Sequence, residues 1–247
     1  GRYPYYIWGI VWNMLVYYAG GDDVIKKLDN LEPNAWSDPA VLRATEDLYQ
    51  RWDKGYIMPG TAGLTHTESQ TEWLKGKAVF IPCGNWLENE MKTTTPADFN
   101  MTVSNIPGYA DGKGDQNAVN ANGGETYIVP AKGKNTAGGM EYLRALLSKE
   151  SSKYFAENVR AIMPVSGGTE GAKLSEGMKA GVALADASKG VTINMNFTNW
   201  YSQLNKEIEQ RTGELMTGTI KPADFISNMQ KAADTVAADP DIKKFKR

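Results

Sequence analysis

The chain has 247 residues, of which 41% are hydrophobic and 23% charged, and its formal net charge at pH 7 is −2. This length allows one large domain or two smaller ones. The near balance of acidic and basic residues, with no dense basic run, argues against nucleic acid as a partner. A single cysteine excludes an internal disulfide, and a single histidine argues against a histidine-rich metal site or a nucleophilic triad.

The first expected element is a buried helix over residues 8–19. This stretch is strongly apolar but too short to cross a membrane, and Gly20-Gly21 after it is typical of a helix end. After a loop over residues 28–36, Ser37-Asp38-Pro39 predicts a second helix, because a capping side chain precedes a proline in the first turn. Gly55 ends this helix, whose expected buried face consists of Val41, Leu42, Ala44, Thr45, Leu48, Tyr49 and Trp52.

Residues 76–91 carry the most informative pattern in the chain. They follow a short helix expected over residues 67–75. An apolar strand over residues 78–81 is expected to enter the turn Pro82-Cys83-Gly84-Asn85, which presents Trp86 at the start of a helix over residues 87–91. A flat aromatic ring beside the free N–H groups of a helix start suits a flat ligand rich in hydroxyl groups, such as a sugar.

The rest of the chain contains few strands and many helices. Two further strands are expected over residues 100–106 and 125–130, separated by a loop rich in Gly, Asp and Asn. This order, with helices between the strands and a helix-rich end, predicts an α/β fold. The remaining helices are expected over residues 136–147, 151–158, 170–187, 200–217 and 222–237.

Four segments, in the order Pro4 to Trp8, Glu72 to Trp86, Val129 to Val165 and Asn199 to Asp234, resemble the segments of one protein family. These are the sugar-binding extracellular solute-binding proteins (family 1) of ABC importers, the maltose-binding-protein superfamily. The resemblance implies a type II periplasmic-binding-protein-like fold, and the wording Gly-Asn-Trp-Leu-Glu-Asn-Glu and Gly-Gly-Glu is most similar to lipoproteins that bind N-acetylglucosamine or diacetylchitobiose.

The resemblance also implies a division into lobes. Family members begin with a further segment of comparable size, which builds most of the N-terminal lobe and carries a lipid-anchored cysteine. The chain is therefore expected to be the C-terminal portion of such a protein. Residues 1–121 and 166–247 would form the C-terminal lobe, and residues 122–165 a late piece of the N-terminal lobe. The expected location is the extracellular face of the membrane or the periplasm.

Eight residues are candidates for binding the ligand. An aromatic ring that buries the C–H face of a sugar contributes roughly 1.5–2.5 kcal/mol, while amides and carboxylates pair with the hydroxyl groups. For every ring the alternative is packing in the core, which we expect of Trp8, Trp12 and Trp52. For Trp36 and Trp73 both roles stay open, and the core is favoured. The candidates are Trp86, Trp200 and Tyr5 for stacking, Asn85, Glu125 and Asn199 for polar contacts, and Gly123 and Gly124 for backbone contacts at a hinge.

These features favour a receptor without catalytic activity. We expect a monomer that closes on a mono- or oligosaccharide and docks to ABC transporter permease subunits, with no cofactor and no metal. A glycoside hydrolase acting on amino sugars is an alternative, which needs two facing carboxylates. Glu125 with Glu88 or Glu90 is the pair available, although Glu88 and Glu90 are typical of a solvated helix face. A carbohydrate-binding surface module is a third possibility.

Overall fold

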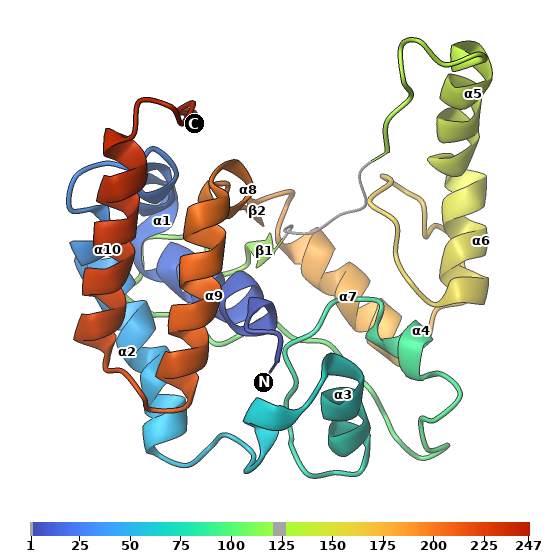
Figure 1. The fold of residues 1–247 in the computed structure, drawn as a ribbon. Helices are drawn as coiled ribbons and strands as arrows, with labels where there is room; N and C mark the ends of the chain where they lie inside the picture. The colour runs from blue at the N-terminus through green and yellow to red at the C-terminus, as the bar shows by residue number, and fades with distance from the viewer. Residues whose placement is uncertain (1, 121–126) are drawn as a thin grey trace. The chain divides into compact units, whose positions relative to one another are not determined.

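The computed structural model describes residues 2–120 and 127–247 of the chain. These residues divide into two compact units, each with its own internal packing. The chain passes between the units more than once, so each is built from segments far apart in the sequence (Figure 1). Unit 1 comprises Gly1–Pro82, Asn105–Asn122 and Ala187–Arg247, and unit 2 comprises Cys83–Ser104 and Gly123–Asp186.

Unit 1 is a helical bundle around an aromatic core. Helix α1 (Asn13–Asp29) packs on α2 (Pro39–Asp53), and α9 (Ser202–Met216) and α10 (Pro222–Ala238) run side by side and contact α2 (Figure 1). At the centre Trp12 stacks on Trp36, with ring centroids 5.6 Å apart and 11° between the planes. The shorter helices of unit 1 are η1 (Tyr6–Trp12), η2 (Ala35–Ser37), η3 (Thr61–Gly63), α3 (His66–Leu74) and α8 (Phe197–Trp200).

Two short strands of unit 1 pair in parallel. They are β1 (Val119–Asn120) and β2 (Thr192–Ile193), with Val119 opposite Thr192. The strands expected over residues 78–81, 100–106 and 125–130 are not formed where the structure describes these residues. An apolar run predicts a strand only if a neighbouring strand takes its backbone hydrogen bonds, and the run itself does not show whether one exists. The side chains of Val79 and Phe80 are accordingly 82% and 81% exposed.

Most expected helices are confirmed, but the expected end of the first helix is wrong. Asp38 caps α2 as expected, since its Oδ1 accepts a hydrogen bond from the Ala40 N–H at 3.0 Å. The first helix was expected to end at Gly20-Gly21, but it continues to Asp29. Gly21 adopts φ 71° and ψ −167°, which kinks the helix, and the chain then resumes a helical path. A glycine pair can therefore mark a kink as well as an end. Leu42 of α2 is 38% exposed and does not belong to the buried face.

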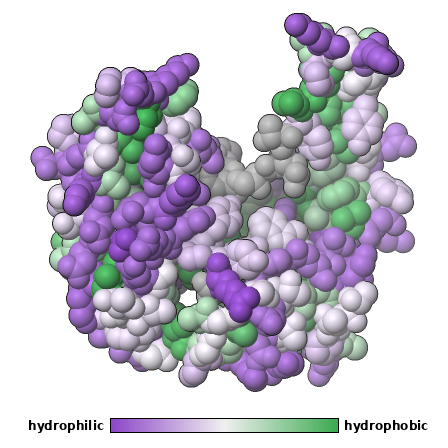
Figure 2. Space-filling model, viewed as in Figure 1, coloured by the Kyte–Doolittle hydropathy of each residue, from purple (hydrophilic) through white to green (hydrophobic). Residues whose placement is uncertain are grey.

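Unit 2 contains four helices among its described residues: α4 (Leu87–Met91), α5 (Thr136–Leu146), α6 (Lys149–Val159) and α7 (Glu176–Ala187). Asn135 caps α5 and Ser148 caps α6, each through its side-chain oxygen. No residue of α5 is buried, although the helix is rich in apolar side chains. Apolar surface is visible over α5 and α6 in Figure 2. The large exposed apolar side chains there are Met140, Tyr142, Leu147 and Tyr154.

Candidate functional site

Trp86 lies at the start of α4, where the sequence predicts it. Its indole lies directly over Gly84, since a Cβ atom on Gly84 would fall 2.0 to 2.4 Å from three atoms of the ring. The following residue, Leu87, is buried and anchors the turn in unit 2. Trp86 itself is only partly buried. The ring is thus supported by a glycine backbone and keeps part of its surface accessible.

Asn85, the neighbour of Trp86, is exposed and ties the turn to the segment after α6. Its Nδ2 donates a hydrogen bond to the carbonyl oxygen of Ile162 at 3.1 Å. This bond connects residues that lie 77 positions apart. It therefore helps fix the turn that presents Trp86.

Glu88 has a structural environment that differs from the solvated one expected. Its side chain is 15% exposed, accepts a hydrogen bond from Ser175 Oγ at 2.6 Å, and lies 3.6 Å from Arg160 Nη1. Both carboxylate oxygens are therefore engaged within unit 2. The expectation for Glu88 was wrong because its partners come from distant segments, which helical spacing does not reveal. Glu90 is exposed, as expected.

Trp200 ends the short helix α8 in unit 1. Its indole stacks on the ring of Phe245, with centroids 5.4 Å apart and 28° between the planes, and meets Tyr201 edge-on at 6.3 Å. The ring packs against the hydrophobic core but is only partly buried. The preceding residue, Asn199, is exposed. Phe245 thus supports one face of the Trp200 ring.

A buried carboxylate holds α8 in place. Asp29 is fully buried, and its Oδ1 accepts hydrogen bonds from the backbone N–H groups of Asn196 at 2.7 Å and Phe197 at 2.9 Å. Its Oδ2 pairs with the guanidinium of Arg247 at 2.9 Å. A helix of four residues that is capped this way depends on a side chain 168 positions earlier in the chain. No local sequence pattern marks Asp29, so only the fold reveals its role.

Tyr5 packs mainly against its own helix. Its ring meets Trp8 edge-on at 5.4 Å, and a Cβ atom on Gly9 would fall 2.8 Å from the ring. The ring is partly buried, and burial raises the pKa of the Tyr5 phenol. Its hydroxyl group is therefore neutral at physiological pH and can both donate and accept hydrogen bonds.

Apart from Tyr5, the described candidates are two pairs of sequence neighbours, Asn85 with Trp86 in unit 2 and Asn199 with Trp200 in unit 1. Their contacts with a ligand stay a prediction, as do those of Tyr5. Gly123, Gly124 and Glu125 lie outside the described residues. The expected core role is confirmed for the four buried indoles, those of Trp8, Trp12, Trp36 and Trp73. Trp52 is partly buried and packs against the core, with its ring 5.4 Å from that of Tyr49.

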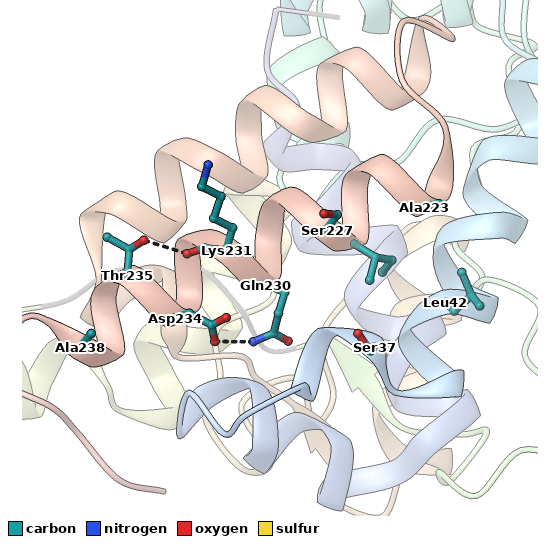
Figure 3. A pocket seen from close by; sticks show the side chains of 10 residues that line it. Ser37, Leu42, Ala223, Ser227, Gln230, Lys231, Asp234, Thr235 and Ala238 are labelled. Atoms are coloured by element: carbon teal, nitrogen blue, oxygen red, sulfur yellow. Dashed lines mark hydrogen bonds between the residues drawn. The ribbon is translucent and has the colours of Figure 1, made fainter.

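A groove of about 810 Å³ on α10 contains none of these candidates (Figure 3). The Gln230 carboxamide in this groove is already engaged: it accepts from the Trp36 N–H at 3.0 Å and donates to Asp234 at 2.7 Å. None of the described residues that line the groove is aromatic, so the groove offers no flat surface for a sugar ring. The lining residues are Ser37, Leu42, Ala223, Ile226, Ser227, Gln230, Lys231, Asp234, Thr235 and Ala238.

Residues 2–120 and 127–247 contain neither a cluster of metal ligands nor a helix suited to crossing a membrane. Nowhere in these ranges do three side chains of His, Cys, Asp or Glu gather closely enough to hold a metal ion. No helix in the same ranges has both the length and the apolar character needed to span a bilayer.

Comparison with known sequences gives two matches. Residues 3–153 match the profile of the family described as bacterial extracellular solute-binding protein. The chain is also 32% identical over 235 residues to the diacetylchitobiose binding protein NgcE of Streptomyces coelicolor (strain ATCC BAA-471 / A3(2) / M145). That match covers 92% of this chain and 49% of the relative, so the chain spans about half the length of the relative.

Solved structures share the fold. A chitin oligosaccharide binding protein superposes with a TM-score of 0.75 at 22% identity, over 93% of this chain and 56% of the other. A protein from work on xylan utilization by the thermophilic bacterium Caldanaerobius polysaccharolyticus superposes with a TM-score of 0.74 at 17% identity, over 94% of this chain and 59% of the other. At these identities the likeness shows the fold alone, and it confirms the expected periplasmic-binding-protein-like class.

Proposed function

We propose that this chain, which belongs to the bacterial extracellular solute-binding protein family, captures an amino sugar for an ABC importer and does not transform it. The ligand class is N-acetylglucosamine or a chitooligosaccharide. The name of the 32% identical relative supports this class, since that protein is a diacetylchitobiose binding protein. The observation that carries the proposal is that the indoles of Trp86 and Trp200 are only partly buried and each follows an exposed asparagine, whereas four other indoles are buried.

Each of these indoles has the support that a stacking surface needs. The backbone of Gly84 lies under Trp86, and the ring of Phe245 lies under Trp200. A supported ring loses little conformational freedom when a ligand binds, so more of the stacking free energy is retained as affinity. The free face of each ring would bury the C–H face of a pyranose, and each contact of this kind contributes roughly 2 kcal/mol.

A polar neighbour of each indole would contribute specificity. Asn85 and Asn199 lie beside the two indoles and are exposed. Carboxamides both donate and accept hydrogen bonds, so they suit the hydroxyl and N-acetyl groups of the proposed sugar. The remaining proposed contacts are Tyr5, Glu125 and the backbone of Gly123 and Gly124. A sugar lacking a matching group would leave a buried partner unpaired, at a cost of about 1–3 kcal/mol.

We propose the expected lobe assignment for the full-length protein as well. Residues 122–165 include α5 and α6, whose apolar side chains are exposed in this chain. Exposed apolar surface of this kind is typical of an interface. In the full-length protein, an N-terminal lobe that corresponds to the unmatched half of the relative would cover this apolar surface. The proposed protein is a monomer at the extracellular face of the membrane or in the periplasm, and its partners are permease subunits.

A hydrolase is not favoured by the described residues. Glu88 is engaged by Ser175 and Arg160, which gives it a role in the packing of unit 2. A general acid must instead face the scissile bond and hold a proton at neutral pH. The neighbouring Glu90 lies on the exposed side of α4.

Calorimetric titration of the natural full-length protein tests the proposal. Diacetylchitobiose, N-acetylglucosamine and maltose would be compared at one temperature, and the diacetylchitobiose mixture would then be analysed for released N-acetylglucosamine. We expect saturable binding of diacetylchitobiose, at least tenfold weaker binding of maltose, and no release. Release of N-acetylglucosamine would identify a hydrolase, and heat signals without saturation would exclude a receptor for this sugar.

A further inference from the structure

The C-terminal segment, residues 239–247, lies against the part of unit 1 that presents Trp200. Phe245 stacks on Trp200 and contacts Tyr201, with ring centroids 6.2 Å apart in the second pair. The backbone N–H of Phe245 also donates to the Tyr201 hydroxyl group at 2.9 Å. The segment therefore contacts the aromatic pair through both a side chain and its backbone.

Arg247 completes this attachment two residues later. Its guanidinium pairs with Asp29 at 2.9 Å and also donates to the carbonyl oxygen of Asn194. Its backbone N–H donates to Asn30 Oδ1 at 2.8 Å. Arg247 thus joins the end of α1 to the segment just before α8.

The Asp29 carboxylate needs this partner. It is fully buried, whereas the Arg247 side chain is 26% exposed, so the arginine supplies a positive charge at the edge of the buried site. A buried carboxylate without a counter-charge is unfavourable. The same carboxylate accepts the backbone hydrogen bonds that begin α8, the helix that ends with Trp200. The position of Trp200 therefore depends on Asp29, which holds the start of α8, and on Phe245, which stacks on the indole.

We infer that Arg247 and Phe245 are positioning residues for sugar binding: they hold the Trp200 ring at the angle that a bound pyranose requires, without touching the sugar. The inference rests on the proposed function. A stacking contact depends on the ring face lying parallel to the sugar, and a ring whose support is lost samples other orientations. Loss of either residue therefore weakens sugar binding even under conditions where the bundle is folded.

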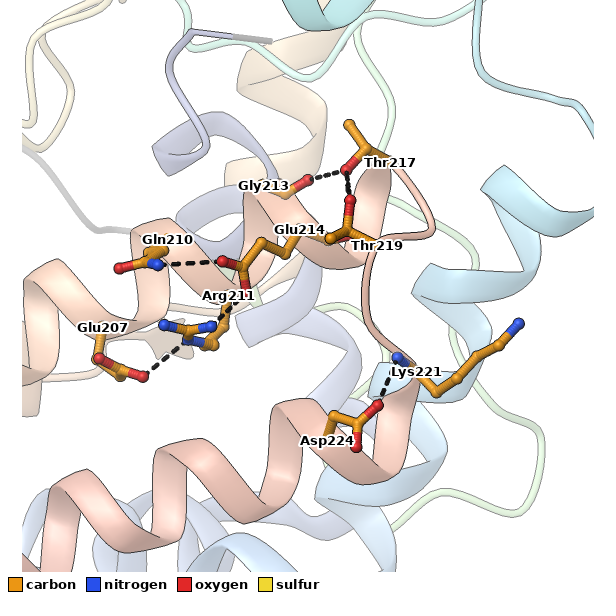
Figure 4. Close-up of polar contacts among 9 residues, drawn as sticks. All are labelled: Glu207, Gln210, Arg211, Gly213, Glu214, Thr217, Thr219, Lys221 and Asp224. Carbon is orange, nitrogen blue, oxygen red and sulfur yellow. Dashed lines mark hydrogen bonds and ion pairs between the residues drawn. The ribbon is translucent and has the colours of Figure 1, made fainter.

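The experiment compares four variants of the full-length protein labelled with 5-fluorotryptophan. They are Arg247→Met, Arg247→Lys, Phe245→Leu and the matched control Arg211→Met. Arg211 of α9 forms an ion pair with Glu207 at 2.8 Å and one with Glu214, in the same unit but outside α8 and the C-terminal segment (Figure 4). Its side chain is 18% exposed and those of its two partners are 28% and 25% exposed, so its removal shows the general effect of losing a partly buried ion pair in unit 1.

Two quantities are measured at a temperature where every variant is folded. One is the 19F resonance of the Trp200 indole, assigned by its loss in Trp200→Phe, and the other is the Kd for diacetylchitobiose. We expect Arg247→Met and Phe245→Leu to shift this resonance and to raise the Kd at least tenfold. Arg247→Lys restores the charge beside Asp29 and is expected to bind within threefold of the wild type. Arg211→Met is expected to change neither quantity.

Trp200→Ala, measured beside them, separates this inference from the proposed function. If Trp200→Ala weakens binding while Arg247→Met and Phe245→Leu bind within twofold of the wild type, the positioning role is wrong and the receptor function stands. An equal loss of affinity in Arg211→Met would also overturn the positioning role, because general stability would then explain it. If Trp200→Ala itself leaves the Kd unchanged, the stacking role of Trp200 and the positioning role both fail.

Discussion

The indole of Trp86 covers the Cα atom of Gly84 so closely that no side chain fits between them: a Cβ atom there would lie 2.0 Å from the ring. Gly84 is not among the glycines with positive φ in this structure, so its backbone accepts alanine. The contact with the ring is therefore what requires glycine at this position.

Gly84→Ala is expected to displace the Trp86 ring and to raise the Kd for diacetylchitobiose about tenfold, a loss of about 1.4 kcal/mol. Gly63→Ala is the control, since a Cβ atom at Gly63 meets no atom within 4 Å. Calorimetric titration of both variants would check this. Equal affinities of the two variants would show that the position of the Trp86 ring does not matter for binding.

Removal of the Asp29 carboxylate is expected to destabilise the protein strongly. Asp29→Ala leaves the N–H groups of Asn196 and Phe197 without their acceptor and removes the partner of Arg247. Loss of one member of a buried, hydrogen-bonded ion pair costs about 3 kcal/mol or more. The measurement is the free energy of unfolding in urea.

Asp23→Ala, at an exposed position of the same helix, is the control for Asp29→Ala and is expected to stay within about 0.5 kcal/mol of the wild type. A cost below 1 kcal/mol for Asp29→Ala would contradict the capping role of this carboxylate.

The raised pKa of Tyr18 leads us to expect a loss of stability in alkaline solution. Burial, with smaller effects from Asp115 and Tyr17, raises the pKa of Tyr18 to about 12, and its hydroxyl group donates to the Ala118 carbonyl at 3.0 Å. In the unfolded chain the phenol ionises near pH 10. The neutral phenol therefore contributes stability that is fully present below pH 10 and is lost as the pH rises through 12. The maximum slope is about 1.4 kcal/mol per pH unit.

Thermal unfolding followed between pH 9 and pH 11.5 tests this account of Tyr18. Tyr18→Phe removes the titrating group, so its Tm should fall less steeply with pH than that of the wild type. Tyr56→Phe, at a position 76% exposed, should keep the wild-type slope. Parallel curves for Tyr18→Phe and the wild type would contradict the prediction.

The sequence predicts the helices of this chain better than its strands, for a physical reason. A helix satisfies its own backbone groups, so a cap such as Asp38 and the apolar spacing after it are sufficient to predict α2. A strand depends on a neighbour, and the apolar run at Val79 and Phe80 gives no sign of whether one is present. The same limit applies to Asp29 and Glu88, whose partners lie far away in the sequence.

The position of Trp86 before a short helix follows from its local pattern, and the structure confirms that helix over Leu87–Met91. The support under the two indoles does not follow in the same way. Gly84 lies two residues before Trp86 and could have been inferred from a turn that needs a small residue. Phe245 is 45 positions after Trp200, so only the fold reveals that it lies under the ring.

The most direct test of the proposed receptor is to remove each indole and titrate the protein with diacetylchitobiose. Trp86→Ala and Trp200→Ala should each weaken binding by about 2 kcal/mol or more, about thirtyfold in Kd. Trp52→Ala is the control, since this partly buried ring packs on Tyr49 and the core, and it should lower stability but leave the Kd unchanged. Losses below about 0.5 kcal/mol for both Trp86→Ala and Trp200→Ala, in folded protein, would contradict sugar capture by these rings.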